Sequence, residues 1–422
     1  MGLENRERSG YKEWLFLSDF VTLSPLLAPR RSAAYEDTDS MKQTDRPWDW
    51  ANIGFLTLSP LAAIGLAGFY IPHYGIRGCE IAAFVAMFFA TGLSITAGYH
   101  RHFAHVTYKA HPLIRLFYLV FGACAMENSA LNWAADHRLH HRYVDTDKDP
   151  YNAGLGFWYS HMGWIFYQTP KDRDFTMVGD LMRDRLVRWQ HRHHVAIALG
   201  VGFAIPAAIG CAIGRPVGML LWAGLIRVVF VHHMTFFINS LAHMYGTQPY
   251  SRSDTSRDSW WLALLTNGEG YHNFHHRFPS DYRNGIRWYQ WDPTKWLIAG
   301  LHWMGATDRL HRIPSHLILK ARMDVEASDA EKRLQDIAHD RGAALRAGID
   351  AARLRLEQAL AQWAESRARY WEFKKAAWQG SERVALRQWK YNLRDYERRL
   401  SEAREHWKTM LQSLQRVSVS IP

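Results

Sequence analysis

The chain has only three cysteines among 422 residues, and none of them belongs to a C-x-x-C pair. This excludes a disulfide framework and a thiolate zinc site. A glycine-rich dinucleotide fingerprint is missing, and so is a fused haem-binding electron-carrier domain. The N-terminal region does not fit a myristoylation pattern, because its sixth residue is neither Ser nor Thr. It does not fit a cleavable signal peptide, because acidic residues interrupt it. The composition therefore points away from secreted disulfide proteins and from self-contained dinucleotide enzymes.

The charge of the chain is strongly positive but unevenly distributed. A formal net charge of +11 and a pI near 9.5 could indicate nucleic-acid binding. The mean hydropathy of −0.29, however, conceals long uncharged apolar runs within residues 51–240. Basic loops facing an anionic cytoplasmic leaflet explain the charge better, so we expect no nucleic-acid partner.

Four apolar runs are long enough to cross about 30 Å of hydrocarbon as helices. We place these spans at about 51–72, 79–98, 195–214 and 217–238. The links within each pair are short, which predicts two hairpins. Lys and Arg gather in the N-terminal arm, in residues 99–194 and after residue 240, so the positive-inside rule places both termini in the cytoplasm. Residues 112–133 are apolar but interrupted by charges, and we expect a half-buried or interfacial helix there.

The composition divides the chain into three parts. We expect a cytoplasmic arm at 1–47, a membrane domain at 48–320 and a helical extension at 321–422. In the extension, one expected helix runs from Leu334 to Tyr370, and Gly380-Ser381 forms the turn to a second. The second helix carries apolar residues at alternating spacings of three and four: Leu386, Trp389, Leu393, Tyr396, Leu400, Ala403, Trp407, Met410 and Leu414. This pattern indicates an antiparallel hairpin or an oligomerisation coiled coil, and docking of an electron donor is the alternative.

Histidine occurs in three separated clusters. His137, His140 and His141 have H-x-x-H-H spacing, and the same spacing recurs at His272, His275 and His276. Positions i, i+3 and i+4 fall on one face of a helix, so we expect the three imidazoles of each box to converge on one point.

The remaining candidate ligands lie at the ends of spans. His100 and His105 follow the second span, and His243 follows the fourth. Nine imidazoles exceed what one ion can bind, which implies two metal ions. Imidazole suits iron, zinc or copper, and a redox role at a membrane face favours iron.

These boxes resemble those of the membrane fatty-acyl desaturases, particularly the stearoyl-CoA (Δ9) branch, in a bacterial form. The resemblance covers about residues 48–310. It is carried by four motifs: His100-x-x-x-x-His105, Asp136-His-Arg-Leu-His-His141, Asn239-Ser-Leu-Ala-His243 and Asn267-Gly-Glu-Gly-Tyr-His-Asn-Phe-His-His276. It implies an all-α integral membrane fold, with two transmembrane hairpins and a cytoplasmic helical cap.

The resemblance also implies a diiron centre, with no catalytic residues beyond the metal ligands. These are His100, His105, His137, His140, His141, His243, His272, His275 and His276, with Asn239 reaching one iron through water. Dioxygen is the implied co-substrate. The implied reaction consumes two electrons and removes hydrogens from two adjacent methylenes of a long saturated acyl chain. The product is a cis double bond, and the resemblance implies the Δ9 position. Asn128, Trp133 and Asp136 match family contacts to the thioester arm and the nucleotide head. Phe88 and Gly92 lie two or three helical turns before His100, and we expect them to line the end of the acyl tunnel.

Other readings remain open. Ala135 stands where animal members carry a basic residue, so a phospholipid or acyl carrier protein remains an alternative to acyl-CoA. A diiron acyl or alkane hydroxylase is the rival enzyme, and a metal-binding membrane scaffold is the rival of another class. We expect an external electron donor (a ferredoxin, cytochrome or flavoprotein reductase), a bacterial inner-membrane location, and a homo-oligomer if the C-terminal helices associate.

Several residues near the boxes are expected to have other roles. His102 lies two positions from His100, on the opposite side of a helix. His232 and His233 are expected to hydrogen-bond ligand histidines, and His161 to be an interfacial polar residue. Glu269 superficially matches the carboxylate–histidine pair of soluble diiron bundles, a reading that we discount.

Overall fold

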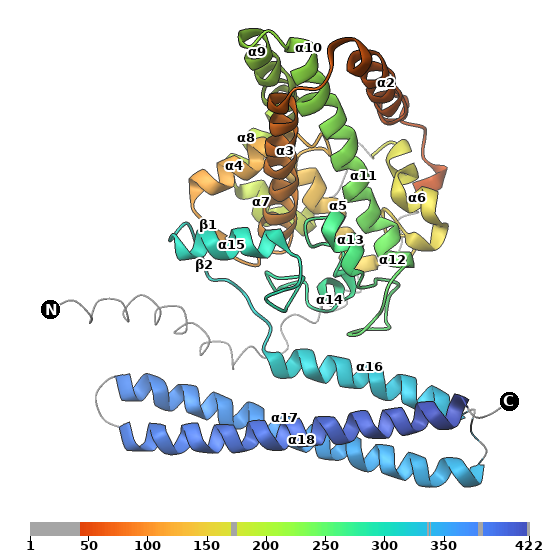
Figure 1. Ribbon diagram of the computed structural model, residues 1–422, viewed down its shortest axis with the longest axis vertical. Helices are drawn as coiled ribbons and strands as arrows, with labels where there is room; N and C mark the ends of the chain where they lie inside the picture. The colour runs from red at the N-terminus through yellow and green to blue at the C-terminus, as the bar shows by residue number, and fades with distance from the viewer. Residues whose placement is uncertain (1–42, 170–174, 336, 338, 379–382, 420–422) are drawn as a thin grey trace. The chain divides into compact units, whose positions relative to one another are not determined.

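A computed structural model describes residues 43–169, 175–335, 337, 339–378 and 383–419 (Figure 1). The described chain is almost entirely helical, as the sequence predicts. It divides into two compact units, one spanning residues 39–313 and the other containing residues 314–422. The predicted arm at 1–47 lies outside the described residues except for its last five. The functional boundaries of the three predicted parts remain predictions.

The first unit alternates long helices with short turns. Its elements are η2 (Gln43–Asp45), α2 (Trp50–Tyr74), α3 (Gly78–Leu93), η3 (Ser94–Ala104), β1 (Lys109–Ala110), α4 (Pro112–Ala123), α5 (Ala130–Tyr143), η4 (Ala153–Leu155), α6 (Phe157–His161), η5 (Gly163–Phe166), η6 (Thr176–Val178), α7 (Gly179–Arg183), α8 (Arg185–Leu199), η7 (Gly200–Ala204), α9 (Ile205–Ala212), α10 (Pro216–Met219), η8 (Leu220–Ile226), α11 (Arg227–Asn239), α12 (Leu241–Met244), α13 (Trp260–Leu265), α14 (His272–Arg277), α15 (Pro293–Trp303) and β2 (Thr307–Asp308). The strands β1 and β2 pair antiparallel, with Lys109 opposite Asp308.

Four continuous helical segments are long and apolar enough to cross a membrane. They run over Trp50–Tyr74, Gly78–Ala104, Arg185–Ala212 and Pro216–Met244. The four predicted spans and their two hairpins are therefore confirmed, but each helix extends beyond its apolar run. The third starts ten residues earlier than predicted, because Asp184 caps it by accepting hydrogen bonds from the backbone N–H groups of Leu186 and Val187.

A helix follows the second span, as predicted, but it ends at Ala123 and not near residue 133. Helix α4 has only 12 residues, too few to cross a bilayer. It packs against η3 and α8. The chain then turns at residues 124–129 and enters α5, where the Ser129 side chain accepts a hydrogen bond from the Asn132 backbone N–H. Helix α5 and the first histidine cluster therefore belong to the same part of the fold.

An ion pair joins the two hairpins at their turns. Arg215 Nε lies 2.8 Å from Glu80 Oε1, and Tyr70 donates to the same oxygen at 2.7 Å. The remaining guanidinium nitrogens donate to the backbone carbonyls of Tyr74 and Gly75. Position 218 must be glycine here, because a Cβ would lie 1.8 Å from Glu80 Oε1.

We expect Glu80→Gln to lower the thermal unfolding midpoint by roughly 5 °C or more, since Arg215 would lose its charged partner in a site shielded from water. Differential scanning fluorimetry in detergent measures the effect. The matched control is Glu365→Gln, which breaks an exposed pair with Arg369 and should change the midpoint by about 1 °C at most. Equal shifts in the two variants would contradict the role assigned to Glu80.

Among its described residues, the second unit contains three helices, α16 (Ser315–Gln335), α17 (His339–Trp378) and α18 (Arg383–Val419). Helices α17 and α18 pack along each other, and the predicted turn at Gly380-Ser381 lies outside the described residues. The prediction of one helix from Leu334 to Tyr370 is wrong, because the chain breaks between α16 and α17. Folding back allows α16 to bury its own apolar face against the hairpin, including Met323 and Leu334 beside Trp407.

Candidate metal centre and acyl pocket

The nine predicted histidines come from four elements that meet at one end of the membrane helices. Figure 1 shows α5, α12 and α14 near the end of α11. The segment η3 and the residue after it carry His100 and His105, and α12 carries His243. The side chains form two groups, and within each group the donor atoms lie within 4.8 Å of one another. The five-histidine group contains His100, His105, His137, His141 and His275, and the four-histidine group contains His140, His243, His272 and His276.

The ring nitrogens within each group are spaced for metal binding. In the five-histidine group, His275 Nε2 lies 3.0 Å from His100 Nε2 and 2.9 Å from His141 Nε2. In the four-histidine group, His272 Nε2 lies 3.1 Å from His243 Nε2 and 3.0 Å from His276 Nε2. Ligands at about 2.0–2.1 Å from one ion and about 90° apart would be about 2.9 Å from each other. The donor set therefore fits a metal ion in each group.

Each H-x-x-H-H box is divided between the two groups. His137 and His141 of α5 belong to the five-histidine group, whereas His140 belongs to the other. Helix α14 does the reverse, since His272 and His276 share the four-histidine group and His275 lies in the five-histidine group. The expectation that one box converges on one point is wrong. Residues i and i+4 are nearly aligned along an α-helix, but i+3 and i+4 diverge by about 100°.

A π-helical segment brings His100 and His105 together. The backbone N–H of His105 donates to the carbonyl of His100 at 3.0 Å, an i→i+5 bond. This wider turn places residues five apart above each other, and the two imidazole centroids are 4.9 Å apart. A regular α-helix would turn these side chains well away from each other.

Burial keeps five of the nine imidazoles neutral, which is the form that binds metal. Removal from water and the neighbouring imidazoles hold the pKa values of His137, His141, His272, His275 and His276 well below the ordinary value of 6.5. A lone pair on one nitrogen of each ring is therefore available. These five rings therefore need no deprotonation before they bind an ion.

Several imidazoles have a second polar partner that sequence reasoning missed. His140 Nδ1 lies 2.9 and 3.0 Å from the two oxygens of Asp149, and His100 Nδ1 lies 3.0 Å from Glu269 Oε2. His137 Nδ1 is 3.2 Å from the Tyr151 hydroxyl, and His243 Nδ1 is 2.8 Å from Thr255 Oγ1. Such partners orient ligand rings. The only signal in the sequence is the position of Asp149 and Glu269 next to the boxes.

Glu269 remains ionised although it is fully buried. Burial alone would raise the pKa of its carboxyl, but the charge of Arg101 and its contact with His100 lower the pKa below the ordinary value. Arg101 is itself only 1% exposed and also lies 3.1 Å from Asp292. The carboxylate of Glu269 therefore lies between the Arg101 guanidinium and the His100 ring.

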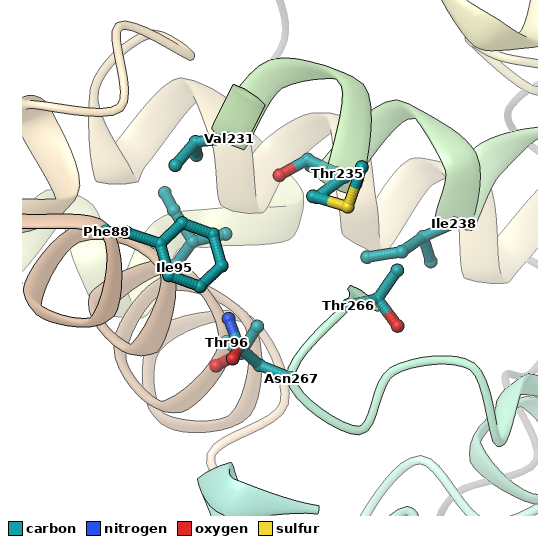
Figure 2. A pocket seen from close by; sticks show the side chains of 10 residues that line it. Phe88, Ile95, Thr96, Val231, Thr235, Ile238, Thr266 and Asn267 are labelled. Atoms are coloured by element: carbon teal, nitrogen blue, oxygen red, sulfur yellow. The ribbon is translucent and has the colours of Figure 1, made fainter. Parts of the chain in front are cut away.

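A narrow pocket lies between α3, η3 and α11, beside the turn that follows α13 (Figure 2). Ten residues line it: Phe88, Gly92, Ile95, Thr96, Val231, Met234, Thr235, Ile238, Thr266 and Asn267. Most are apolar or carry only a hydroxyl, which suits a hydrocarbon chain. The cavity volume of about 20 Å³ is that of a single water molecule, so the surrounding helices must move apart for an acyl chain to enter. Phe88 and Gly92, predicted at the end of an acyl tunnel, both belong to this lining. The ring of Phe88 packs against the rings of Phe84 and Phe230.

The three predicted headgroup residues surround the start of α5. Trp133 stacks on His137 with centroids 4.9 Å apart, so it contacts the five-histidine group. Asn128 has a positive φ of 79° and its side-chain oxygen accepts a hydrogen bond from Asn132. Asp136 is partly buried on the same helix. Their roles toward a substrate remain predictions.

The other histidines lie outside both groups. His102 contacts the Tyr108 carbonyl, as its position on the helix predicts. His232 bonds the Ala125 carbonyl and His233 bonds His161, so the expectation that they support ligand histidines is wrong. His161 is buried rather than interfacial. Asn239 is the last residue of α11, four residues before His243.

A buried acid links the pocket to the metal groups. Trp133 Nε1 donates to Glu127 Oε2 at 3.3 Å, and Thr235 of the pocket also contacts this carboxyl. Burial raises the pKa of Glu127 to about 8. The carboxyl is therefore protonated at neutral pH in the folded protein.

We expect Glu127→Gln to stabilise the protein increasingly as pH rises. The unfolded carboxyl titrates near 4.5 and the folded one near 8, so wild-type stability falls as pH rises from about 5 to about 8. The amide removes this dependence. Thermal unfolding at pH 5, 6.5 and 8 measures it, with Glu365→Gln as the control. A constant difference between Glu127→Gln and wild type across these pH values would contradict the assignment.

Comparison with known proteins agrees with this architecture. The sequence model of the fatty acid desaturase family matches residues 80–303. Acyl-CoA desaturase 1 of Saccharomyces cerevisiae is 41% identical over 299 residues, which cover 69% of this chain and 59% of that protein. Stearoyl-CoA desaturase 5 of Bos taurus is 36% identical over 272 residues (62% of this chain, 79% of that protein).

A lipid desaturase is also similar. The sn-1 stearoyl-lipid 9-desaturase of Synechocystis is 32% identical over 257 residues, covering 61% of this chain and 78% of that protein. The match covers 59% of the length of the Saccharomyces cerevisiae protein, and 59% of the length of a probable acyl-CoA desaturase of Schizosaccharomyces pombe. With four membrane-spanning helices and a match to the family over residues 80–303, the chain is an integral membrane protein of the fatty acid desaturase family.

Proposed function

We propose that the protein introduces a cis double bond, at Δ9, into a long saturated acyl chain carried by coenzyme A. The observation that carries this proposal is the position of two imidazole groups beside an apolar pocket. Two irons bound there supply the chemistry that couples oxidation of the chain to reduction of dioxygen. The balance is one dioxygen, two electrons and two protons consumed, two hydrogens removed from adjacent methylenes, and two waters formed.

The nine histidines are the proposed iron ligands. The five-histidine group would hold one ion and the four-histidine group the other, with Asn239 completing the second through water. Neutral imidazole suits iron, zinc and copper alike, and the need for redox chemistry selects iron. The protein contributes rigid ligands, a pocket that excludes water, and a fixed distance between the acyl chain and the metals.

The acyl chain is proposed to lie in the pocket of Figure 2 with its end toward Phe88. Trp133 would form the wall between the chain and the five-histidine group, because its ring stacks on His137. Asn128 and Asp136 would contact the headgroup. A phospholipid or an acyl carrier protein is the alternative carrier, since Ala135 offers no phosphate contact and one relative carries the name of a lipid desaturase.

Electrons are proposed to come from a separate ferredoxin, cytochrome or flavoprotein reductase. We place the protein in a bacterial inner membrane with both termini cytoplasmic, on the distribution of Lys and Arg in the sequence. The helices α17 and α18 are the proposed oligomerisation element.

Product analysis tests the proposal. The protein is expressed in cells with defined lipids and active electron donors, and mass spectrometry locates any new double bond. We expect a cis alkene at carbon 9. An alcohol would identify a hydroxylase, and unchanged saturated lipids would contradict the proposal. Purified protein with stearoyl-CoA, stearoyl carrier protein or stearoyl phospholipid then identifies the carrier.

A deletion separates the enzyme from a scaffold. If the C-terminal helices are the functional part, removing residues 325–422 abolishes function in cells while variants of the histidines retain it. The enzyme reading predicts that the histidine variants lose all product.

A further inference from the structure

Glu269 lies directly behind the five-histidine group. Its Oε2 is 3.0 Å from His100 Nδ1, while Nε2 of the same ring faces His275 Nε2 at 3.0 Å. The imidazole therefore lies between a carboxylate and the centre of the group. The 3.0 Å contact lacks the angles of a hydrogen bond, so it is the negative charge of the carboxylate that acts on Nδ1. Glu269 is 2% exposed and His100 is 5% exposed, so water does not compete for this contact.

Glu269 is itself held from two sides. Arg101 donates to Oε1 at 2.8 Å, and Asn284 Nδ2 donates to Oε2 at 2.6 Å. Arg101 is fixed in turn by the Tyr282 carbonyl at 2.8 Å and by Asp292. Because each carboxylate oxygen already has a donor, the carboxylate cannot rotate away from the ring.

We propose that Glu269 is a positioning residue for the metal site, an inference that rests on the proposed function. It keeps the proton of His100 on Nδ1 and leaves the lone pair of Nε2 for the ion. A neutral imidazole has one N–H and one lone pair, so the partner of one nitrogen decides which of them the metal meets. Arg101 and Asn284 hold the carboxylate in the orientation that this requires.

The four-histidine group has a corresponding carboxylate. Asp149 contacts His140 Nδ1 through both oxygens, and it accepts hydrogen bonds from the backbone N–H groups of Asp145 and Tyr151. Each group thus contains a histidine backed by an acid. The chain therefore offers a matched pair of variants, Glu269→Gln and Asp149→Asn, that act on different ions.

The amide in Glu269→Gln reverses the hydrogen-bond pattern. The new NH2 group must replace either Oε1, to which Arg101 donates, or Oε2, which lies beside His100 and to which Asn284 donates. In both places a donor would face another donor. If the NH2 faces His100, it donates to Nδ1 and moves the ring proton to Nε2, where the metal should bind. Asp292 still pairs with Arg101, so the variant does not leave the guanidinium without a carboxylate.

Metal titration of the purified full chain tests the inference. Apoprotein is titrated with Fe2+ by calorimetry, and Mössbauer spectra are recorded on protein loaded with 57Fe. We expect Glu269→Gln to weaken binding of one ion by about 10- to 100-fold and to leave the other unchanged, with one doublet altered. Asp149→Asn should affect the other ion. Glu269→Asp retains a carboxylate and should lose less affinity than the amide.

Two outcomes would overturn the inference. One is binding of both ions to Glu269→Gln with wild-type affinity and wild-type spectra. The other is equal loss of both ions together with a large fall in the unfolding midpoint of the apoprotein, which would show a merely structural role. The proposed function fails differently: wild-type protein would bind metal but form no alkene.

Discussion

Replacing His275 with alanine should abolish double-bond formation and lower the iron content of the protein. His275 is central to the five-histidine group, since its Nε2 lies within 3.0 Å of the Nε2 atoms of His100 and His141. Alanine removes a ligand and leaves a gap that water can enter. Loss of a residue that only supports a ligand costs about 10- to 100-fold, so loss of the ligand itself should cost at least about 100-fold in product.

The control for this variant is His102→Gln. His102 lies near His100 in the sequence, yet it contacts the Tyr108 carbonyl and belongs to neither group. Glutamine retains a hydrogen-bond donor. We expect wild-type product and iron, measured by gas chromatography and elemental analysis of the same preparations. If His275→Ala kept its product, the reaction would not depend on the five-histidine group.

Replacing Gly92 with leucine should shorten the acyl chain that the enzyme prefers by about two carbons. Gly92 lines the pocket beside Phe88, and a Cβ there would meet only the end of the Asn267 side chain, at 2.7 Å. The four added carbons then occupy space that the chain end would fill. Each methylene that a pocket gains or loses changes selectivity about 10- to 200-fold, so the ratio of palmitoyl to stearoyl products should rise at least about 10-fold.

Gly65→Leu is the matched control for the pocket variant. Gly65 lies on α2, and a Cβ there would have no neighbour within 4 Å. This variant should leave the product profile unchanged. Phe88→Ala is the opposite test, because removing the ring should allow longer chains. An unchanged profile in both Gly92→Leu and Phe88→Ala would show that the acyl chain lies elsewhere.

The sequence predicted the membrane helices because hydrophobic length is a local property. A run of about 20 uncharged residues must find an apolar environment, whatever its neighbours are. The four spans follow from this rule. The ends of the helices did not, because capping by Asp184 and the continuation of α3 into η3 depend on individual side chains and turns.

The identities of the nine histidines could also be predicted, because clustered imidazoles are rare outside metal sites. Their division into two groups could not. It depends on the π-helical turn that aligns His100 with His105, and on the angle at which α5 and α14 face each other. Neither is encoded by spacing alone.

The sequence by itself therefore determined an all-helical membrane protein with clustered histidines. Only the tertiary structure decided which imidazoles lie together. It also decided that Glu269 lies beside His100 and that Asp149 lies beside His140. The physical reason is that ligand type and hydrophobic length are properties of short segments. Distances between ring nitrogens and buried carboxylates arise only when η3, α5, α12 and α14 pack together.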